Sequence, residues 1–176
     1  MAWLSVAAFI VAGTLGALSI AAKGRAVLTI LGTLAFLLVT FAGGVGILFA
    51  GSPSHPFLPQ HALQGIIAAS ALWAAVLGGG AVVRMVLEWA NGGQPDPDRL
   101  PGSAWIGVAE RFAFTLALII GATEIAAVVL AAKALGVYAT RKDNATAAVR
   151  VLGTLVSIGW ALYCFAVAVL VGFRLA

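Results

Sequence analysis

The stretch that decides the fold is residues 104–138, AWIGVAERFAFTLALIIGATEIAAVVLAAKALGVY. It contains two apolar runs, separated by Gly121-Ala122-Thr123, and four charged residues: Glu110, Arg111, Glu124 and Lys133. Charged side chains at membrane depth are energetically unfavourable and usually face a protein interior or a water-filled cavity. These four residues are therefore the first candidates for a functional site.

The composition of the whole chain predicts a polytopic membrane protein. The chain has 176 residues, of which 62% are hydrophobic and 9% are charged, and its mean hydropathy is +1.10. Soluble domains carry about 25% charged residues, and several apolar runs here exceed the roughly 20 residues that cross a bilayer. We expect an all-α transmembrane helix bundle that forms one domain over residues 1–176, without a separate soluble domain.

Six membrane spans are predicted, near residues 2–22, 26–50, 63–89, 104–120, 124–138 and 147–173. As a single helix, residues 104–138 would be roughly 52 Å long, which exceeds a bilayer core of about 30 Å unless the helix tilts strongly. As a hairpin they break at Gly121, Thr123 is the N-cap of the second helix, and Glu124 complements the positive end of that helix. The alternatives are a re-entrant hairpin or one long helix, which gives five spans.

The distribution of basic residues favours the hairpin. With six spans, most basic residues fall on one side of the membrane, which the positive-inside rule makes the cytoplasmic side; they are Lys23, Arg25, Arg84, Arg99, Arg141, Lys142 and Arg150. His55, Thr123 and both termini then lie on the opposite side, with Arg174 as the exception. Because these residues stand beside apolar runs, the net charge of +4 does not indicate a nucleic-acid partner.

Glu110 and Lys133 are predicted to form an ion pair across the hairpin. Each lies eleven residues from the turn at Gly121-Ala122, so they face each other, roughly 10 Å from the inner ends of their helices. Removing one partner would leave the other charge buried and unpaired, which would lower the stability of the fold by about 3–5 kcal/mol. Arg111 points about 100° away from Glu110, so it either extends to the headgroups or meets a different partner.

This group admits two interpretations. It is either a buried ion pair that fixes the register of two helices, or a site for a proton, an ion or an anionic ligand. Arg84 and Glu88 are spaced for an ion pair between successive helical turns. In the alternative interpretation, Arg84 pairs with Glu110. Two glycine clusters, at 43–46 and 78–80, favour close helix packing, although the second cluster could also create a break that lines a cavity.

No motif in the sequence assigns a reaction. His55 and His61 lie in a proline-rich loop without a Cys or acidic residue nearby, so no metal site is assigned. The sequence lacks the phosphate-binding loop, the His-Glu-x-x-His zinc motif and the Gly-x-Ser-x-Gly nucleophile motif. Asp96 and Asp98 are the remaining candidates for phosphate chemistry. Catalytic residues and cofactor are therefore left unassigned, and the single Cys164 excludes an intrachain disulfide.

Three motifs in the second half resemble an uncharacterised bacterial family of multi-pass membrane proteins. They are Ile106-Gly107-x-x-Glu110-Arg111, Ala131-Ala132-Lys133 and Gly153-Thr154-Leu155-x-Ser157, and the resemblance covers about residues 104–165. The chain departs from the family pattern at Gly136-Val137-Tyr138, which replaces a more basic segment, and before Leu152, where an acidic-aromatic segment is missing. The resemblance implies a protein of the bacterial cytoplasmic membrane with Glu110, Arg111 and Lys133 as signature residues, and it implies no activity.

Three functions follow from these observations, in order of preference. The first is a non-enzymatic membrane component, either a subunit or assembly partner of a larger membrane complex or a structural homo-oligomer, since the chain is small, lacks catalytic motifs and is rich in small residues. The second is a small transporter or channel that uses the group of Glu110, Arg111 and Lys133. The third is an intramembrane lipid-modifying enzyme, for which Asp96, Asp98 and Arg99 are the candidates.

Overall fold

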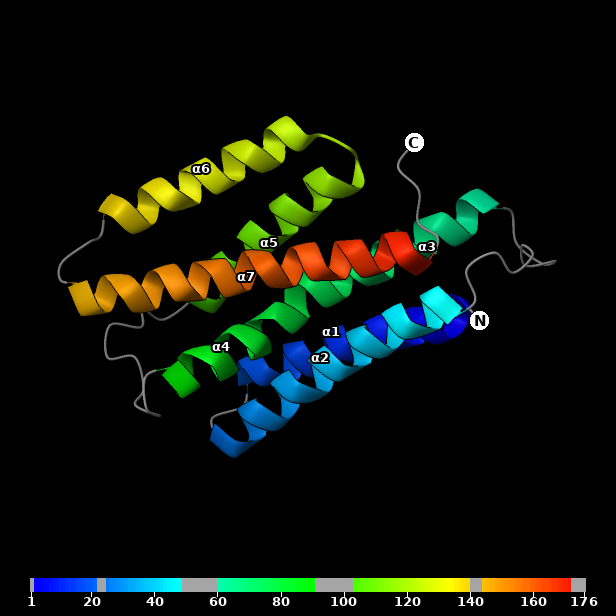
Figure 1. The fold of residues 1–176 in the computed structure, drawn as a ribbon, viewed down its shortest axis with the longest axis horizontal. Coiled ribbons are helices and arrows are strands. Elements are labelled where there is room, and N and C mark those ends of the chain that lie inside the picture. Colours follow the sequence, from blue (N-terminus) through cyan, green and yellow to red (C-terminus); the bar gives the residue numbers. More distant parts are fainter. Residues whose placement is uncertain (1, 22–24, 49–59, 91–102, 140–143, 172–176) are drawn as a thin grey trace.

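The computed structural model describes residues 2–21, 25–48, 60–90, 103–139 and 144–171, and these residues form an all-helical structure (Figure 1). The helices are α1 (Ala2–Ala21), α2 (Arg25–Leu48), α3 (Gln60–Trp73), α4 (Gly79–Ala90), α5 (Ser103–Ile119), α6 (Thr123–Ala139) and α7 (Asn144–Val171). A π-helical segment, η1 (Ala74–Gly78), joins α3 to α4. Since α3, η1 and α4 form one rod, the described residues fold as six helical rods.

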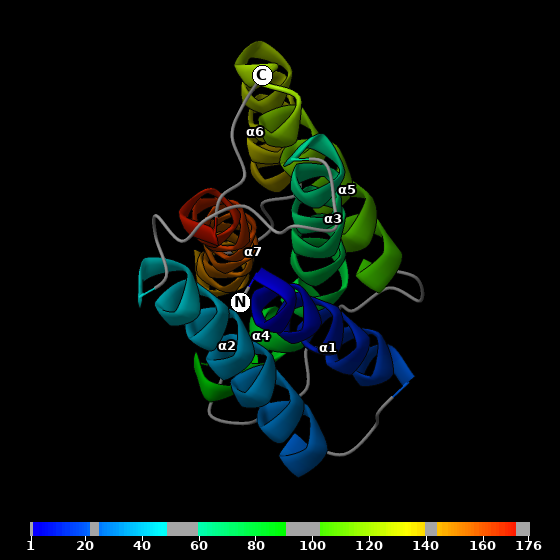
Figure 2. The same cartoon turned by 90° about the vertical axis from the view of Figure 1, so that its right-hand side faces the viewer.

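Successive rods run in opposite directions along the longest axis of the molecule (Figure 1). Seen from the end, α1 and α2 lie on one side and α6 on the opposite side, with α7, α3 and α5 between them (Figure 2). The ends of the helices differ from the predicted spans by only a few residues. The hydrophobic runs therefore located the helices correctly.

Two of the described helical stretches are long and apolar enough to cross a membrane, by length and composition alone. They are His61–Ala90 and Ala148–Val171, and the apolar stretches Trp3–Ser19 and Ile30–Gly44 are shorter.

A sharp turn separates α5 from α6, as the hairpin prediction requires. Gly121 has a φ of +74°, a conformation that glycine adopts without strain. The amide of Gly121 donates to the carbonyl of Leu118, and that of Ala122 donates to the carbonyl of Ala117. This pair of bonds is the Schellman motif, which ends a helix at a glycine of positive φ.

The N-cap of α6 is one residue earlier than predicted. The carbonyl of Ala122 accepts hydrogen bonds from the amides of Ile125 and Ala126, so Ala122 occupies the cap position and Thr123 is the first helical residue. The Schellman bond from Ala122 to Ala117 holds Ala122 against the end of α5. Helix α6 therefore begins directly after Ala122. Glu124 lies in the first turn of α6, as predicted, and both Thr123 and Glu124 are exposed.

Small residues allow the rods in the main core to approach closely. A Cβ atom on Gly16 of α1 would overlap the backbone of Leu77 and Gly78, and one on Gly13 would overlap the side chain of Trp73. The residues buried in this core include Phe9, Val39, Ile67, Trp160 and Cys164. A second, smaller core forms between α5, α6 and α7, around Phe114, Ala117, Ala126 and Ala161.

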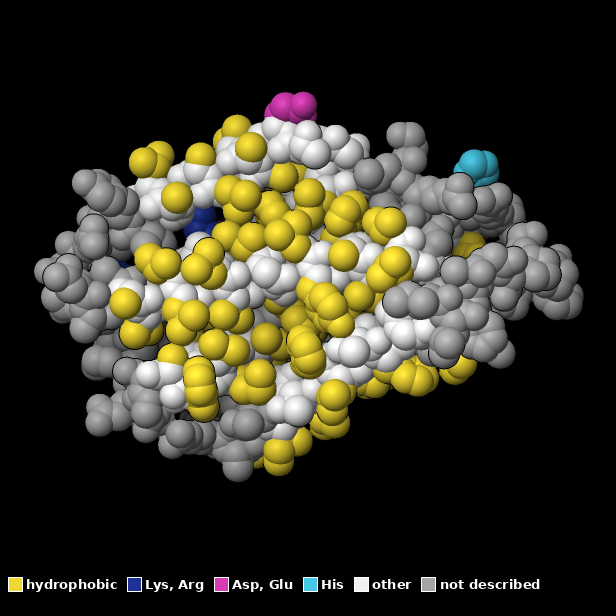
Figure 3. All heavy atoms as spheres, viewed as in Figure 1, with side chains coloured by type: hydrophobic (Ala, Val, Ile, Leu, Met, Phe, Trp, Pro, Cys, Tyr) yellow, Lys and Arg dark blue, Asp and Glu magenta, His cyan; other side chains and the backbone are white. Residues whose placement is uncertain are grey.

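The lateral surface of the bundle is apolar, while several polar side chains lie inside. Large hydrophobic residues are exposed along α1, α2, α5, α6 and α7, and hydrophobic side chains cover much of the face shown in Figure 3. The buried polar residues in the described part of the chain are Ser5, Ser19, Ser70, Arg111, Thr115 and Ser157. This distribution is the reverse of that expected for a water-soluble bundle, whose outward faces are polar.

Candidate functional site

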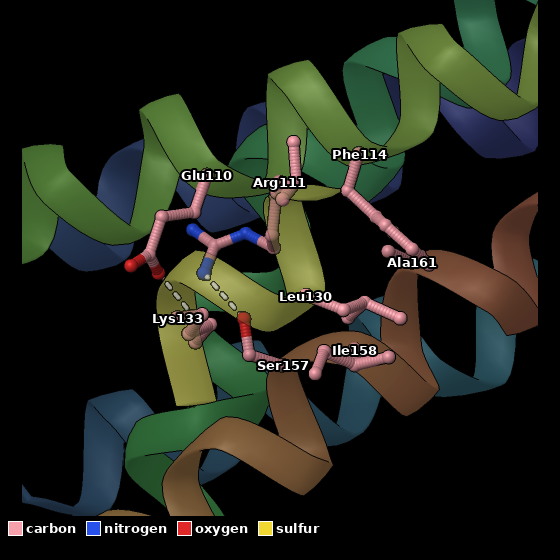
Figure 4. A pocket seen from close by; sticks show the side chains of 9 residues that line it. Glu110, Arg111, Phe114, Leu130, Lys133, Ser157, Ile158 and Ala161 are labelled. Atoms are coloured by element: carbon pink, nitrogen blue, oxygen red, sulfur yellow. Dashed lines mark hydrogen bonds and ion pairs between the residues drawn. The ribbon is translucent and has the colours of Figure 1, made fainter. Parts of the chain in front are cut away.

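The three motifs of the second half converge in space. Glu110 and Arg111 come from α5, Lys133 from α6 and Ser157 from α7, and their side chains meet around one cavity (Figure 4). The Nζ of Lys133 donates to Oε2 of Glu110, so the predicted ion pair across the hairpin is present. The Lys133 side chain is 13% exposed and that of Glu110 is 32% exposed, so the pair lies at the edge of the bundle and not in its centre.

Arg111 is buried and points into the bundle. It is 5% exposed, its Nε donates to the carbonyl oxygen of Val76 at 2.9 Å, and its Nη1 donates to Oγ of Ser157 at 3.4 Å. Of the two alternatives for Arg111, extension to the headgroups is wrong and a different partner is correct. The reason is geometric. Arg111 follows Glu110 by one residue on α5, so its side chain points away from α6 and toward η1 and α7.

The partner of Arg111 is the π-helical segment η1. Hydrogen bonds in a π-turn connect residue i to i+5, and such segments are frequent at functional sites. Two carbonyls of η1 accept hydrogen bonds from other rods: Val76 from Arg111, and Ala74 from Nε1 of Trp160 at 3.1 Å. Side chains of neighbouring helices thus satisfy backbone groups of the irregular segment, as is required inside a bundle.

Glycines make room for these two donors. A Cβ atom on Gly79 would lie 2.7 Å from Nε of Arg111 and 2.7 Å from Cδ1 of Trp160, and one on Gly107 would lie 3.2 Å from Nη1 of Arg111. The glycine cluster at 78–80 therefore serves the predicted role of close packing, since Gly78 and Gly79 lie against Trp160. It adjoins a break in the helical pattern, but the residues that line the cavity come from α5, α6 and α7.

The cavity beside the ion pair is small and has two chemically distinct ends. Its polar lining is Glu110, Arg111, Lys133 and Ser157, and its apolar lining is Phe114, Val129, Leu130, Ile158 and Ala161. Its volume is about 10 Å³, roughly the space needed by a single water molecule. The enclosed space therefore does not hold an organic substrate in this conformation.

Arg84 of α4 contacts the end of α1. Its Nη1 donates to the carbonyl oxygen of Ser19 at 2.5 Å, in the last turn of α1, where carbonyls lack intrahelical partners and cations are favoured. The predicted pairing of Arg84 with Glu88, or with Glu110 as the alternative, stays a prediction. Oε2 of Glu88 is buried without a hydrogen-bond partner in the described part of the chain.

The remaining candidates lie away from this cavity or outside the described residues. His61 is exposed in the first turn of α3, and Thr123 and Glu124 lie at the opposite end of α6 from Lys133. His55, Asp96, Asp98 and Arg99 lie outside the described residues, as do Lys23, Arg141, Lys142 and Arg174. Within the described ranges, no three His, Cys, Asp or Glu side chains are grouped so as to hold a metal ion.

Sequence reasoning missed three contributors to the site. Ser157 could have been found, because it ends the third motif of the resemblance. Trp160 carried a weaker signal, one turn further along the same helix. The carbonyl of Val76 carried none, since a π-turn in an alanine-rich helix has no side-chain signature.

No protein-family model, no curated protein and no solved structure matches this chain. The resemblance over residues 104–165 therefore rests on the three motifs alone. What joins those motifs is their position: each one contributes a polar residue to the same cavity.

Proposed function

We propose that this chain is a six-span integral membrane protein of the bacterial cytoplasmic membrane, and that it acts there as a non-catalytic subunit or assembly partner of a larger membrane complex. The apolar lateral surface supports membrane insertion, because exposed side chains such as Leu18, Ile30, Val128 and Leu135 face outward along the rods. In water, contiguous apolar surfaces of this extent are rare on monomers.

The positions of the helix ends support six spans. The C-terminal ends of α1, α4 and α6 lie at one end of the bundle, together with the starts of α2, α5 and α7 (Figure 1). The segments that join them contain Lys23, Arg99, Arg141 and Lys142, and Arg25 is the first residue of α2. Trp89 and Trp105 are 83% and 62% exposed at this end, as expected for indoles at a membrane interface.

One observation supports a structural role above the others: the charged groups at the centre of the candidate site are held by partners within the bundle. Glu110 binds Lys133, and Arg111 binds Val76 and Ser157. The enclosed space is limited to about one water, whereas large hydrophobic residues are exposed along α1, α2, α5, α6 and α7. Small residues and apolar faces are what membrane helices use to associate with one another.

The test is extraction of the tagged full chain from its native membrane with a mild detergent, followed by native mass spectrometry. We expect stoichiometric co-purification of other membrane proteins or of further copies of the chain. A chain found in the soluble fraction without detergent contradicts membrane insertion. A monodisperse monomer, from which no partner is lost on extraction, contradicts the assembly role.

A small transporter or channel is the second candidate, and the cavity favours it, because its lining residue Arg111 binds the irregular segment η1. Discontinuous membrane helices commonly line binding sites for ions and substrates. In this case Glu110→Gln should abolish transport in a folded protein, whereas joint replacement of His55 and His61 by Ala should leave it intact. If Glu110→Gln fails to fold, the structural interpretation is favoured.

An intramembrane lipid-modifying enzyme using Asp96, Asp98 and Arg99 is the third candidate, and loss of lipid turnover on Asp96→Asn would support it.

A further inference from the structure

We propose that the groove between α5, α6 and α7 binds one anionic phospholipid of the inner leaflet, with its phosphate at Lys133 and Arg111 and one acyl chain along Leu130 and Ile158. This inference rests on the proposed membrane insertion and names a ligand for the same site.

The groove opens toward the surrounding bilayer. On the face shown in Figure 3, basic side-chain atoms are visible in a hollow between α6 and α7, within a surface that is otherwise apolar. The Lys133 and Glu110 side chains are both partly exposed there. Because the enclosed part has room for about one water, a larger ligand must lie along the open side.

The charged and apolar lining residues follow the order of the headgroup and the acyl chains of an inner-leaflet phospholipid. The charged residues Glu110 and Lys133 lie toward the ends of α5 and α6 that carry the basic segments. The apolar lining residues Phe114, Leu130 and Ile158 lie about one turn or less further toward the opposite end. A lipid of the inner leaflet presents its headgroup and its chains in this same order.

The charge of the groove favours an anion. The lining contains two cations, Arg111 and Lys133, and one carboxylate, Glu110, so one positive charge is in excess. The described hydrogen bonds of Arg111 go to neutral acceptors, a carbonyl and a hydroxyl, so they do not neutralise it. Basic pockets between membrane helices on the cytoplasmic side are a recurrent site for anionic headgroups.

The lengths of α5 and α6 bring headgroups to this depth. Each helix has 17 residues, which corresponds to about 25 Å and falls short of a hydrocarbon core of about 30 Å. A short hydrophobic stretch is accommodated by local thinning of the bilayer. Thinning beside this hairpin moves the phosphates of the inner leaflet toward Lys133.

The experiment is native mass spectrometry of the full chain, released from micelles that contain either phosphatidylglycerol or phosphatidylcholine with identical acyl chains. We expect preferential retention of one phosphatidylglycerol. Lys133→Gln should lower this preference about fivefold and Glu110→Gln should raise it by a similar factor, as one unit of charge near a membrane surface implies. Both variants break the same ion pair. If that pair had a purely structural role, both variants would shift the lipid preference in the same direction, and this result would overturn the proposal.

Matched variants separate the groove from its surroundings. Glu124→Gln makes the same charge change at the other end of α6 and should leave the preference unchanged, and an equal effect there overturns the proposal. Leu130→Trp fills the groove without altering charge and should abolish retention, whereas Val128→Trp, on the exposed face of the same helix, should not. If either charge variant fails to fold, the two tryptophan variants still test the proposal. Equal lipid retention by Leu130→Trp and Val128→Trp overturns it.

Two further outcomes are distinguishable. Equal retention of the two lipids by the inserted wild-type chain overturns the lipid inference and leaves the proposed function standing. Competition by glycerol 3-phosphate at the concentration of the lipid also overturns it, since that probe lacks the acyl chains that the apolar lining requires. Recovery of the chain without any detergent removes the proposed function as well.

Discussion

Arg111 shows how a single charged residue can be accommodated inside an apolar bundle. Its neighbour Glu110 is directed to α6, and Arg111 itself reaches a backbone carbonyl that a regular α-helix would keep for its own amide. The guanidinium therefore acts as a hydrogen-bond donor to η1, in addition to contributing charge to the groove. This arrangement explains why adjacent residues of opposite charge have different partners.

Replacing Arg111 with Met should destabilise the fold, because it removes the buried hydrogen bonds to the carbonyl of Val76 and to the hydroxyl of Ser157. A hydrogen bond from a charged donor contributes about 1.5–3 kcal/mol. Arg111→Lys should recover part of the loss, since an ammonium lacks the planar fork that reaches two acceptors. Thermal unfolding in detergent measures the difference, with the exposed Glu124→Gln as control. An Arg111→Met protein as stable as the parent would show that the bond to Val76 contributes nothing.

Trp160→Phe tests the second donor to η1. The substitution keeps an aromatic ring in the core and removes the Nε1–H that bonds to the carbonyl of Ala74. We expect a loss of about 1 kcal/mol in the free energy of unfolding. Trp89→Phe is the matched control, because Trp89 is exposed at the end of α4. Equal small losses at both positions would contradict a specific role for the Trp160 hydrogen bond.

At the scale of elements, α1 depends on backbone contact with η1. Gly16→Ala places a methyl group against the backbone of Leu77 and Gly78, which cannot rotate out of the way as a side chain can. Overpacking of this kind costs about 1–3 kcal/mol or more. Gly65→Ala, where a Cβ meets nothing within 4 Å, should be neutral or slightly stabilising. Chemical denaturation in detergent compares the two, and equal stability would show that the approach of α1 to η1 is not tight.

The turn between α5 and α6 depends on the conformation of Gly121. Gly121→Ala meets no neighbouring atom within 4 Å but must adopt a φ of +74°, which costs about 1–2 kcal/mol for a residue with a Cβ. Gly121→Asn should cost less, because Asn tolerates this conformation. Gly159→Ala is the open helical control. If Ala and Asn at position 121 are equally stable, strain at the turn is not what ends α5.

At the scale of the whole molecule, six spans predict a definite sidedness. Single cysteines introduced at Ala90 and Arg141 in a Cys164→Ala background should react from the cytoplasm, and one at Thr123 should react from the opposite side. Membrane-impermeant thiol labelling of intact cells and of inverted vesicles measures this. Labelling of positions 90 and 141 from opposite faces would replace six spans with five.

The sequence by itself determined the positions of the described helices to within a few residues, that residues 104–138 form a hairpin, and that Glu110 faces Lys133. These features are local, because they follow from runs of apolar residues, from the turn at Gly121 and from equal distances to that turn. The N-cap of α6 was misplaced by one residue, because the Schellman bonds at the end of α5 take precedence over the preference of Thr for cap positions.

Only the tertiary structure decided the partners of Arg111, Arg84 and Trp160. Each donates to a backbone carbonyl on another rod, and a carbonyl carries no sequence identity. Which carbonyl is available depends on the π-turn at Ala74–Gly78 and on the rotation of each helix about its axis. Those quantities are set by the close packing of glycines and alanines between rods that are far apart in the chain, and no pattern within one helix specifies them.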